Sequence, residues 1–133
     1  MIKRATILAV LFSLIACQSP NDLDMTQLSP EERKSVASLA WLKQANVEQD
    51  VESALAKNDH RLLVMAGRSP SLPGVPPELA SKAKTVCDVR YLEGSTDVIQ
   101  GDIHLKLIQA AYDYAAAYNQ ELIKHCLEKI ESK

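Results

Sequence analysis

A long helical pattern, from about Asp102 to near Ile130, constrains the fold more than any other feature of the sequence. Apolar side chains recur there every three or four residues, as they do on one face of a helix. With 133 residues the chain fits one domain, so this helix makes up a large part of it. Cys126 lies on the apolar stripe and is expected to face inward. The full stripe consists of Ile108, Ala111, Tyr112, Ala115, Tyr118, Leu122 and Cys126.

The first half of the domain opens with a strong helix start at Ser29. Ser29 is a capping residue, Pro30 stands at the first helical position, and Glu32 follows three residues after the cap. Apolar residues at helical spacing follow, and Asn46 is a potential cap for a second helix that begins directly after it. One long helix and two short ones satisfy this pattern equally.

Two short apolar segments in the middle of the chain are typical of strands. Arg61–Gly67 is bounded by turn formers and suits a strand buried on both faces, and the proline-rich stretch after it cannot continue the strand. Glu78–Lys84 is expected to form a short helix, and Thr85–Leu92 alternates as a second strand does. The strands can be parallel, with the short helix as the crossover, or can form a long-looped hairpin. We therefore predict a mostly helical α+β domain with a two-stranded sheet, in the order helix, strand, short helix, strand and long C-terminal helix.

The N-terminal segment has the organisation of an export signal. Lys3 and Arg4 give it a positive start, and residues 5–16 form an apolar run that is too short to span a bilayer. The run ends in Leu14–Cys17, which resembles the lipobox of bacterial lipoproteins. The resemblance implies cleavage before Cys17, acylation of Cys17 by diacylglycerol and a further chain such as palmitate, and sorting to the outer membrane, since Gln18 rather than an aspartate follows. An ordinary secretory signal with a chance cysteine is the alternative.

This organisation predicts a signal peptide over residues 1–16, a polar lipid-anchored tether over residues 17–28 and a single globular domain over residues 29–133. Removal of Lys3 and Arg4 with the signal takes the formal charge from −2 to −4. An acidic chain without a basic run does not suit nucleic acid as a partner. The expected partners are the membrane, through the lipid on Cys17, and a protein of the envelope.

The two remaining cysteines, Cys87 and Cys126, are an even count in a chain that is expected to be exported. They predict one disulfide. Cys87 falls on the predicted second strand, so the bond is expected to tie the last helix to the sheet. Two free buried thiols are the alternative.

Parallel strands would bring two polar segments to one edge of the sheet, where open α/β sheets bind ligands. These segments and the start of the last helix supply candidate side chains for a small anionic ligand, namely Arg68, Ser69, Glu93, Ser95, Thr96, Asp97 and the nearby His104. The alternative is purely structural. In that case Gly94 turns the chain, Ser95 or Asp97 caps the last helix, Arg68 pairs with Glu93 or Asp97, and His104 has a surface or capping role.

No pattern in the sequence supports catalysis, a metal site or a cofactor. No two of the three histidines stand at a ligand spacing such as i, i+4, and no nucleophile motif is present once the cysteines are assigned. The chain is therefore predicted not to be an enzyme.

Three tyrosines of the last helix, Tyr112, Tyr114 and Tyr118, wrap around it rather than forming one stripe. We expect Tyr114 to lie at the surface, where it would form a protein contact together with Trp41.

Parts of the domain resemble small uncharacterised proteins of Gram-negative bacteria, a resemblance that implies a family without an activity. The matching parts are Arg61–Leu63 before Gly67, Pro73–Val75, Glu93–Asp97, Tyr114–Ala115 and Tyr118–Asn119. The expected function is that of a non-enzymatic lipoprotein that binds another envelope protein, as small assembly factors and secretin pilots do. A periplasmic lipoprotein that neutralises a toxin or lytic enzyme, and a binder of a small anionic ligand, are the alternatives.

Overall fold

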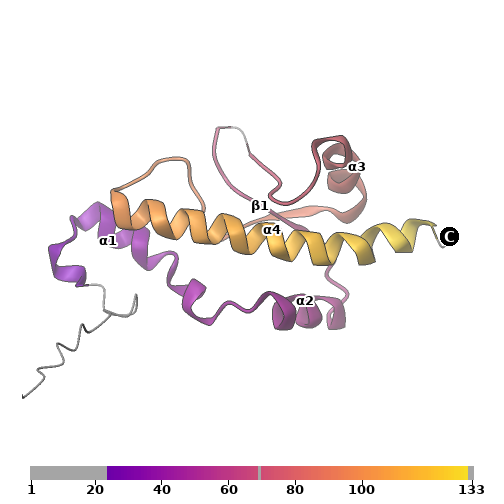
Figure 1. The fold of residues 1–133 in the computed structure, drawn as a ribbon, viewed down its shortest axis with the longest axis horizontal. Helices are drawn as coiled ribbons and strands as arrows, with labels where there is room; N and C mark the ends of the chain where they lie inside the picture. The colour runs from indigo at the N-terminus through magenta and orange to yellow at the C-terminus, as the bar shows by residue number, and fades with distance from the viewer. Residues whose placement is uncertain (1–23, 69, 132–133) are drawn as a thin grey trace, which may run out of the picture.

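The computed structural model describes residues 24–68 and 70–131 and confirms the predicted mixed fold, with helices around a two-stranded sheet (Figure 1). The predicted signal peptide, Cys17 and Ser69 lie outside the described residues. In chain order the elements are η1 (Met25–Gln27), α1 (Pro30–Ala37), η2 (Ala40–Gln44), α2 (Val47–Ala56), β1 (Leu62–Val64), α3 (Pro77–Cys87), β2 (Val89–Tyr91) and α4 (Asp102–Glu131), where η denotes a 3-10 helix.

The C-terminal helix α4 is the axis of the molecule. Figure 1 shows it running along most of the length of the fold, with α2 on one side and the sheet and α3 on the other. Each of α1, α2, α3 and β1 contacts α4. The helix buries a continuous stripe against them, formed by His104, Ala111, Ala115, Tyr118, Asn119, Leu122 and Cys126.

The predicted stripe is correct except at its edges. Ile108 packs only partly buried against the core. The assignment of Tyr112 to the buried stripe is wrong, because this residue is 45% exposed. Tyr112 follows the fully buried Ala111, and a step of one residue turns the side chain by about 100° around the helix axis, out of the buried stripe.

The N-terminal half forms two α-helices rather than one, joined by the 3-10 helix η2. Ser29 Oγ accepts a hydrogen bond from the Glu32 backbone N–H at 3.1 Å, as the sequence predicted for the start of α1. Asn46 Oδ1 accepts from the Gln49 N–H at 3.0 Å, and Asp50 Oδ2 accepts from the Asn46 N–H at 3.1 Å. This reciprocal pair satisfies N–H groups that a helix start leaves open, so the break falls at Asn46.

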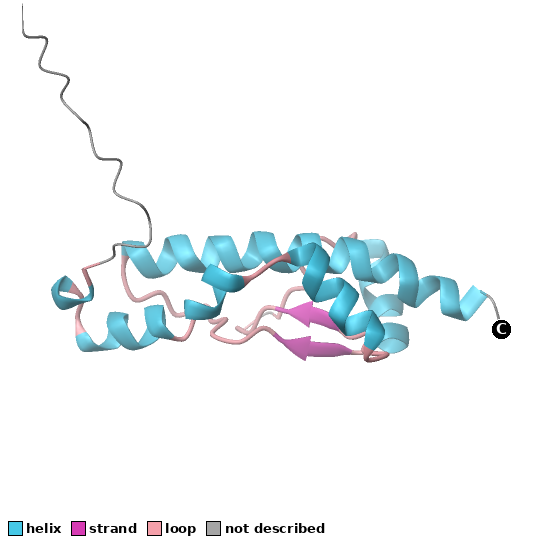
Figure 2. Ribbon diagram, turned by 90° about the horizontal axis from the view of Figure 1, so that it is seen from below, coloured by secondary structure: helices cyan, strands magenta, loops and turns pink. Residues whose placement is uncertain are grey.

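The two strands are parallel, which settles the choice that the sequence left open. Leu62 pairs with Val89, and Val64 pairs with Tyr91. All three residues of β1 are buried, as predicted for a strand covered on both faces. Figure 2 shows the pair lying together on one side of α4.

The boundary between the short helix and the second strand was predicted wrongly. Thr85–Cys87 belongs to α3, which extends to Cys87, and β2 begins only at Val89. Ala83 and Cys87, one helical turn apart, are both buried, so the segment follows the period of a helix rather than of a strand. Asp88, with φ of +64°, then ends the helix because this backbone conformation cannot continue it.

The last residues of the predicted tether are held against the first helix. Arg33 of α1 donates from Nε to the carbonyl of Met25 at 3.1 Å and from Nη2 to the carbonyl of Leu28 at 3.3 Å. The chain therefore enters the domain along α1. Across the part of the chain that the structure describes, no helix combines the length and apolarity that a membrane crossing needs.

Candidate functional site

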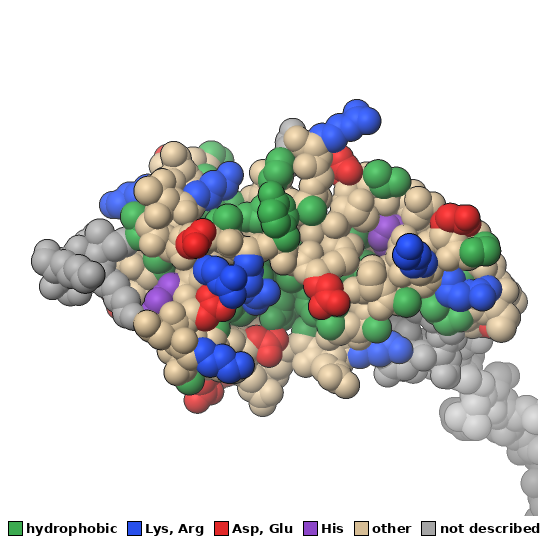
Figure 3. Space-filling model, turned by 180° about the vertical axis from the view of Figure 1, so that it is seen from behind, with side chains coloured by type: hydrophobic (Ala, Val, Ile, Leu, Met, Phe, Trp, Pro, Cys, Tyr) green, Lys and Arg blue, Asp and Glu red, His purple; other side chains and the backbone are tan. Residues whose placement is uncertain are grey.

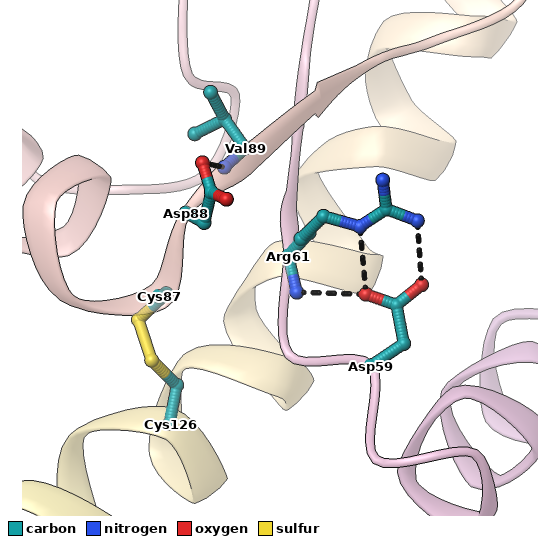
Figure 4. Close-up of a disulfide and its surroundings, with 6 residues drawn as sticks. All are labelled: Asp59, Arg61, Cys87, Asp88, Val89 and Cys126. Atoms are coloured by element: carbon teal, nitrogen blue, oxygen red, sulfur yellow. Dashed lines mark hydrogen bonds and ion pairs between the residues drawn. A yellow bond between two sulfur atoms is a disulfide. The ribbon is translucent and has the colours of Figure 1, made fainter.

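A disulfide joins Cys87 to Cys126, as predicted, with the two Cα atoms 5.6 Å apart (Figure 4). Because Cys87 is the last residue of α3, the bond ties α3 to α4 and not the sheet to α4. Both cysteines are buried. The bond therefore fastens the far end of α4, where fewer elements surround it.

Beside the disulfide, Asp59 and Arg61 form a bidentate ion pair, which Figure 4 shows. Arg61 donates from Nε to Asp59 Oδ1 and from Nη2 to Oδ2, each at 3.0 Å, and its backbone N–H donates to Oδ1 at 3.1 Å. These hydrogen bonds lower the pKa of Asp59 to about 2, and the bond from the Arg61 side chain is the largest cause. The pair holds the turn that leads into β1.

The parallel strands do bring the two predicted polar segments to one edge. Ser95 Oγ accepts from the Ala66 N–H at 3.0 Å and donates to the carbonyl of Leu92 at 2.6 Å. Asp97 Oδ2 accepts from the Arg68 N–H at 2.9 Å. A shallow hollow of about 380 Å³ opens between the segments and is lined by Met65, Ala66, Gly67, Arg68, Ser71, Thr96 and Asp97.

The polar groups of this edge are largely engaged within the protein. Besides the bonds of Ser95 and Asp97, Thr96 Oγ1 accepts from the Val98 N–H at 3.1 Å, and the carbonyl of Glu93 accepts from Trp41 Nε1 at 3.0 Å. An anion in the hollow would meet the carboxylate of Asp97 there. Ligand binding at this edge stays a prediction, which the internal hydrogen bonds do not favour.

His104 does not line the hollow, and the surface role given as its alternative is wrong, because the residue is buried at the start of α4. It is fully buried, and its Nδ1 accepts from the Gln100 N–H at 2.9 Å, which places the ring hydrogen on Nε2. Within the described residues Nε2 has no hydrogen-bond partner. Since α4 begins at Asp102, neither Ser95 nor Asp97 caps it.

Asn119 is the residue whose role the sequence analysis missed. Its side chain is fully buried on α4, where Oδ1 accepts from the Leu63 N–H at 2.7 Å and Nδ2 donates to the carbonyls of Leu63 at 2.9 Å and Pro73 at 2.8 Å. The N–H and C=O of Leu63 point away from β2, so the amide takes the place of a third strand. A polar residue on an otherwise apolar stripe was the available signal.

Tyr114 and Trp41 lie against each other, both half-buried at the edge of the core, so the expected surface pair is only partly exposed. Their ring centroids are 5.2 Å apart in an edge-to-face arrangement, and Tyr114 is only partly exposed. Its hydroxyl donates to Asp50 Oδ2 at 2.7 Å. Burial, and then this bond, raise the pKa of Tyr114 well above its usual range.

Among the residues that the structure describes, no group of three or more histidine, cysteine, aspartate or glutamate side chains is placed to hold a metal ion. Comparison with protein-family models, with curated proteins and with solved structures gives no match to this chain.

Proposed function

We propose that this chain is a lipoprotein of the Gram-negative envelope, anchored in the outer membrane through acyl chains on Cys17 and facing the periplasm. The lipobox-like Leu14–Cys17 supplies the anchor. Each buried methylene of an acyl chain contributes about 0.8 kcal/mol, and several chains together hold a protein stably where a single chain binds reversibly.

The observation that carries this proposal is the disulfide between Cys87 and Cys126. Structural disulfides form and persist in oxidising compartments such as the periplasm. The cysteines of the domain and the N-terminal signal are separate features of the sequence, and both point to export.

Its task is to bind another envelope protein rather than to catalyse a reaction. Exposed apolar side chains support this, because Val98 is 60% exposed and is followed by the exposed Ile99 and, in the first turn of α4, Leu105. Figure 3 shows that apolar side chains also gather near the middle of one face of the molecule, with acidic and basic side chains close by. Apolar contacts bordered by charges are typical of protein interfaces.

Metabolic labelling tests the anchor. The chain is expressed in a Gram-negative host with an alkyne analogue of palmitate, alongside the Cys17→Ser variant. We expect label on the wild type in the outer-membrane fraction and none on the variant. Equal labelling of the two proteins, or none on either, would contradict the anchor.

Photo-crosslinking in living cells tests the binding task. A photoreactive amino acid at Val98 is expected to give a discrete protein adduct, and the same amino acid at the exposed Lys82 of α3 serves as the control. An identical adduct pattern at both positions, or no adduct at Val98, would count against a specific partner there.

A further inference from the structure

A groove separates α2 from the C-terminal half of α4, which lie beside each other in Figures 1 and 2. It encloses about 520 Å³ and is lined by Val47, Glu48, Val51, Glu52, Leu55 and Glu121. Val47, Val51 and Leu55 stand four residues apart along α2, so they form one apolar row. Val51 is buried, and the other two are partly exposed.

The rim of this groove is acidic. All three charged side chains that line it, Glu48, Glu52 and Glu121, are glutamates. Within the described residues, Glu48 and Glu52 form no ion pair, whereas Glu121 contacts Lys124 at 3.3 Å in a largely exposed pair. Lys124 offsets one of the three negative charges, so the rim keeps a net negative charge around an apolar floor.

The spacing of the floor matches a helix better than an extended strand. Positions four residues apart on α2 lie about 6 Å apart along its axis, which is the spacing of the i, i+3 and i+4 side chains on a facing helix. From Val47 to Leu55 the row is about 12 Å long, which matches a little over two turns of a partner helix.

We propose that this groove binds an amphipathic helix of a partner protein, with apolar side chains in the floor and lysine or arginine side chains beside the three glutamates. The inference rests on the proposed function, since it adds to the exposed apolar residues Val98, Ile99 and Leu105 a second binding surface with its own partner chemistry. The negative rim selects against acidic helices and anionic lipid surfaces.

Peptide binding to the full chain in zwitterionic nanodiscs tests this directly, with empty nanodiscs as the blank. The probe is a fluorescent amphipathic peptide of about 14 residues with leucine at i, i+4 and i+7 and flanking lysines. A second peptide carries glutamate in place of lysine, and a third has the lysine peptide's composition in scrambled order. We expect binding of the lysine peptide alone, with amide NMR shifts on α2 and the C-terminal half of α4.

A charge-only variant makes the test specific. Replacing Glu48, Glu52 and Glu121 by glutamine is expected to weaken the lysine peptide's affinity about tenfold at low salt. The matched control replaces three acidic residues outside the groove, as Glu31→Gln, Glu78→Gln and Asp113→Asn, and should leave the affinity within about twofold. Far-UV circular dichroism verifies that both variants keep the fold.

Equal binding of the lysine and glutamate peptides, equal weakening in both variants, or NMR shifts away from the groove would overturn the proposal. The two proposals fail separately. Loss of the palmitate label with retained groove binding overturns the anchor alone, and retained label without peptide binding overturns the groove alone.

Discussion

Replacement of Asn119 by leucine removes the side chain that closes the free edge of β1. Leucine has a similar volume, so the change deletes hydrogen bonds while it keeps the site filled. It leaves the Leu63 N–H, the Leu63 C=O and the Pro73 C=O without the partner that Asn119 provides. These groups lie in the interior, where water cannot replace that partner.

The expected cost follows from those three groups. A buried polar group that loses its partner costs about 1–3 kcal/mol, and a carbonyl tolerates the loss better than an N–H does. We therefore expect Asn119→Leu to lower the free energy of unfolding by about 4 kcal/mol, a large fraction of the 5–15 kcal/mol that is usual for a domain.

Urea unfolding followed by circular dichroism measures this loss with the disulfide intact. At a slope of about 1.5 kcal/mol per molar urea, the midpoint should fall by about 2–3 M. Gln120→Leu, on the exposed side of the same helix, is the matched control and should change stability by less than about 0.5 kcal/mol. A loss below about 1 kcal/mol for Asn119→Leu would refute the role of the amide as a substitute strand.

Three further changes test other parts of the fold. Reduction of the Cys87–Cys126 bond, which spans 39 residues, should destabilise the domain by about 4 kcal/mol, and a urea midpoint unmoved by reductant would contradict this. The pKa of Asp59, lowered to about 2, implies stabilisation that is complete above about pH 4 and lost as the pH falls towards 2. In urea unfolding at pH 5, the wild type should therefore have a free energy of unfolding about 0.5–1 kcal/mol above that of Asp59→Asn, after allowance for exposure. This difference should vanish near pH 2. A difference that does not depend on pH would exclude the Asp59–Arg61 pair as its source. Gly74→Ala, at a φ of +74° and with its new Cβ 2.8 Å from an α4 Cα atom, should cost about 2–4 kcal/mol in thermal unfolding, against a smaller loss for Gly67→Ala, whose φ is not positive.

Local sequence signals predicted the elements that local chemistry controls. The start of α1 at Ser29 and the break at Asn46 follow from caps whose hydrogen bonds span only three or four residues. The extent of α4 follows from an apolar period sustained over its whole length. The disulfide follows from the count of cysteines in a chain with an export signal.

Features that depend on distant segments were missed or left open. The strand direction is set by how α3 packs, which the alternation of single strands does not encode. Thr85–Cys87 alternates like a strand, yet it is helical because Ala83 and Cys87 both reach the core one turn apart. Tyr114 is half-buried because Trp41 and Asp50, far away in the sequence, form its contacts.

The candidate site was likewise predicted only in part. Parallel strands were one of two options, and given that option the meeting of Gly67–Ser69 with Glu93–Asp97 was predicted, as the bond between Arg68 and Asp97 shows. The structural alternative had Arg68 pair with Glu93 or Asp97, and the structure makes this contact through the Arg68 backbone N–H, which donates to Asp97. Asn119 was missed for a related reason, since its partner Leu63 stands 56 residues earlier in the chain.

The intact mass of the protein from its native membranes, measured with and without reductant before alkylation, tests the lipid anchor and the disulfide together. A lipid-anchored, disulfide-bonded protein has the mass of residues 17–133 plus acyl chains, and takes up alkylating reagent at Cys87 and Cys126 only after reduction. A mass without acyl chains, with both thiols alkylated before reduction, would contradict the proposed envelope lipoprotein.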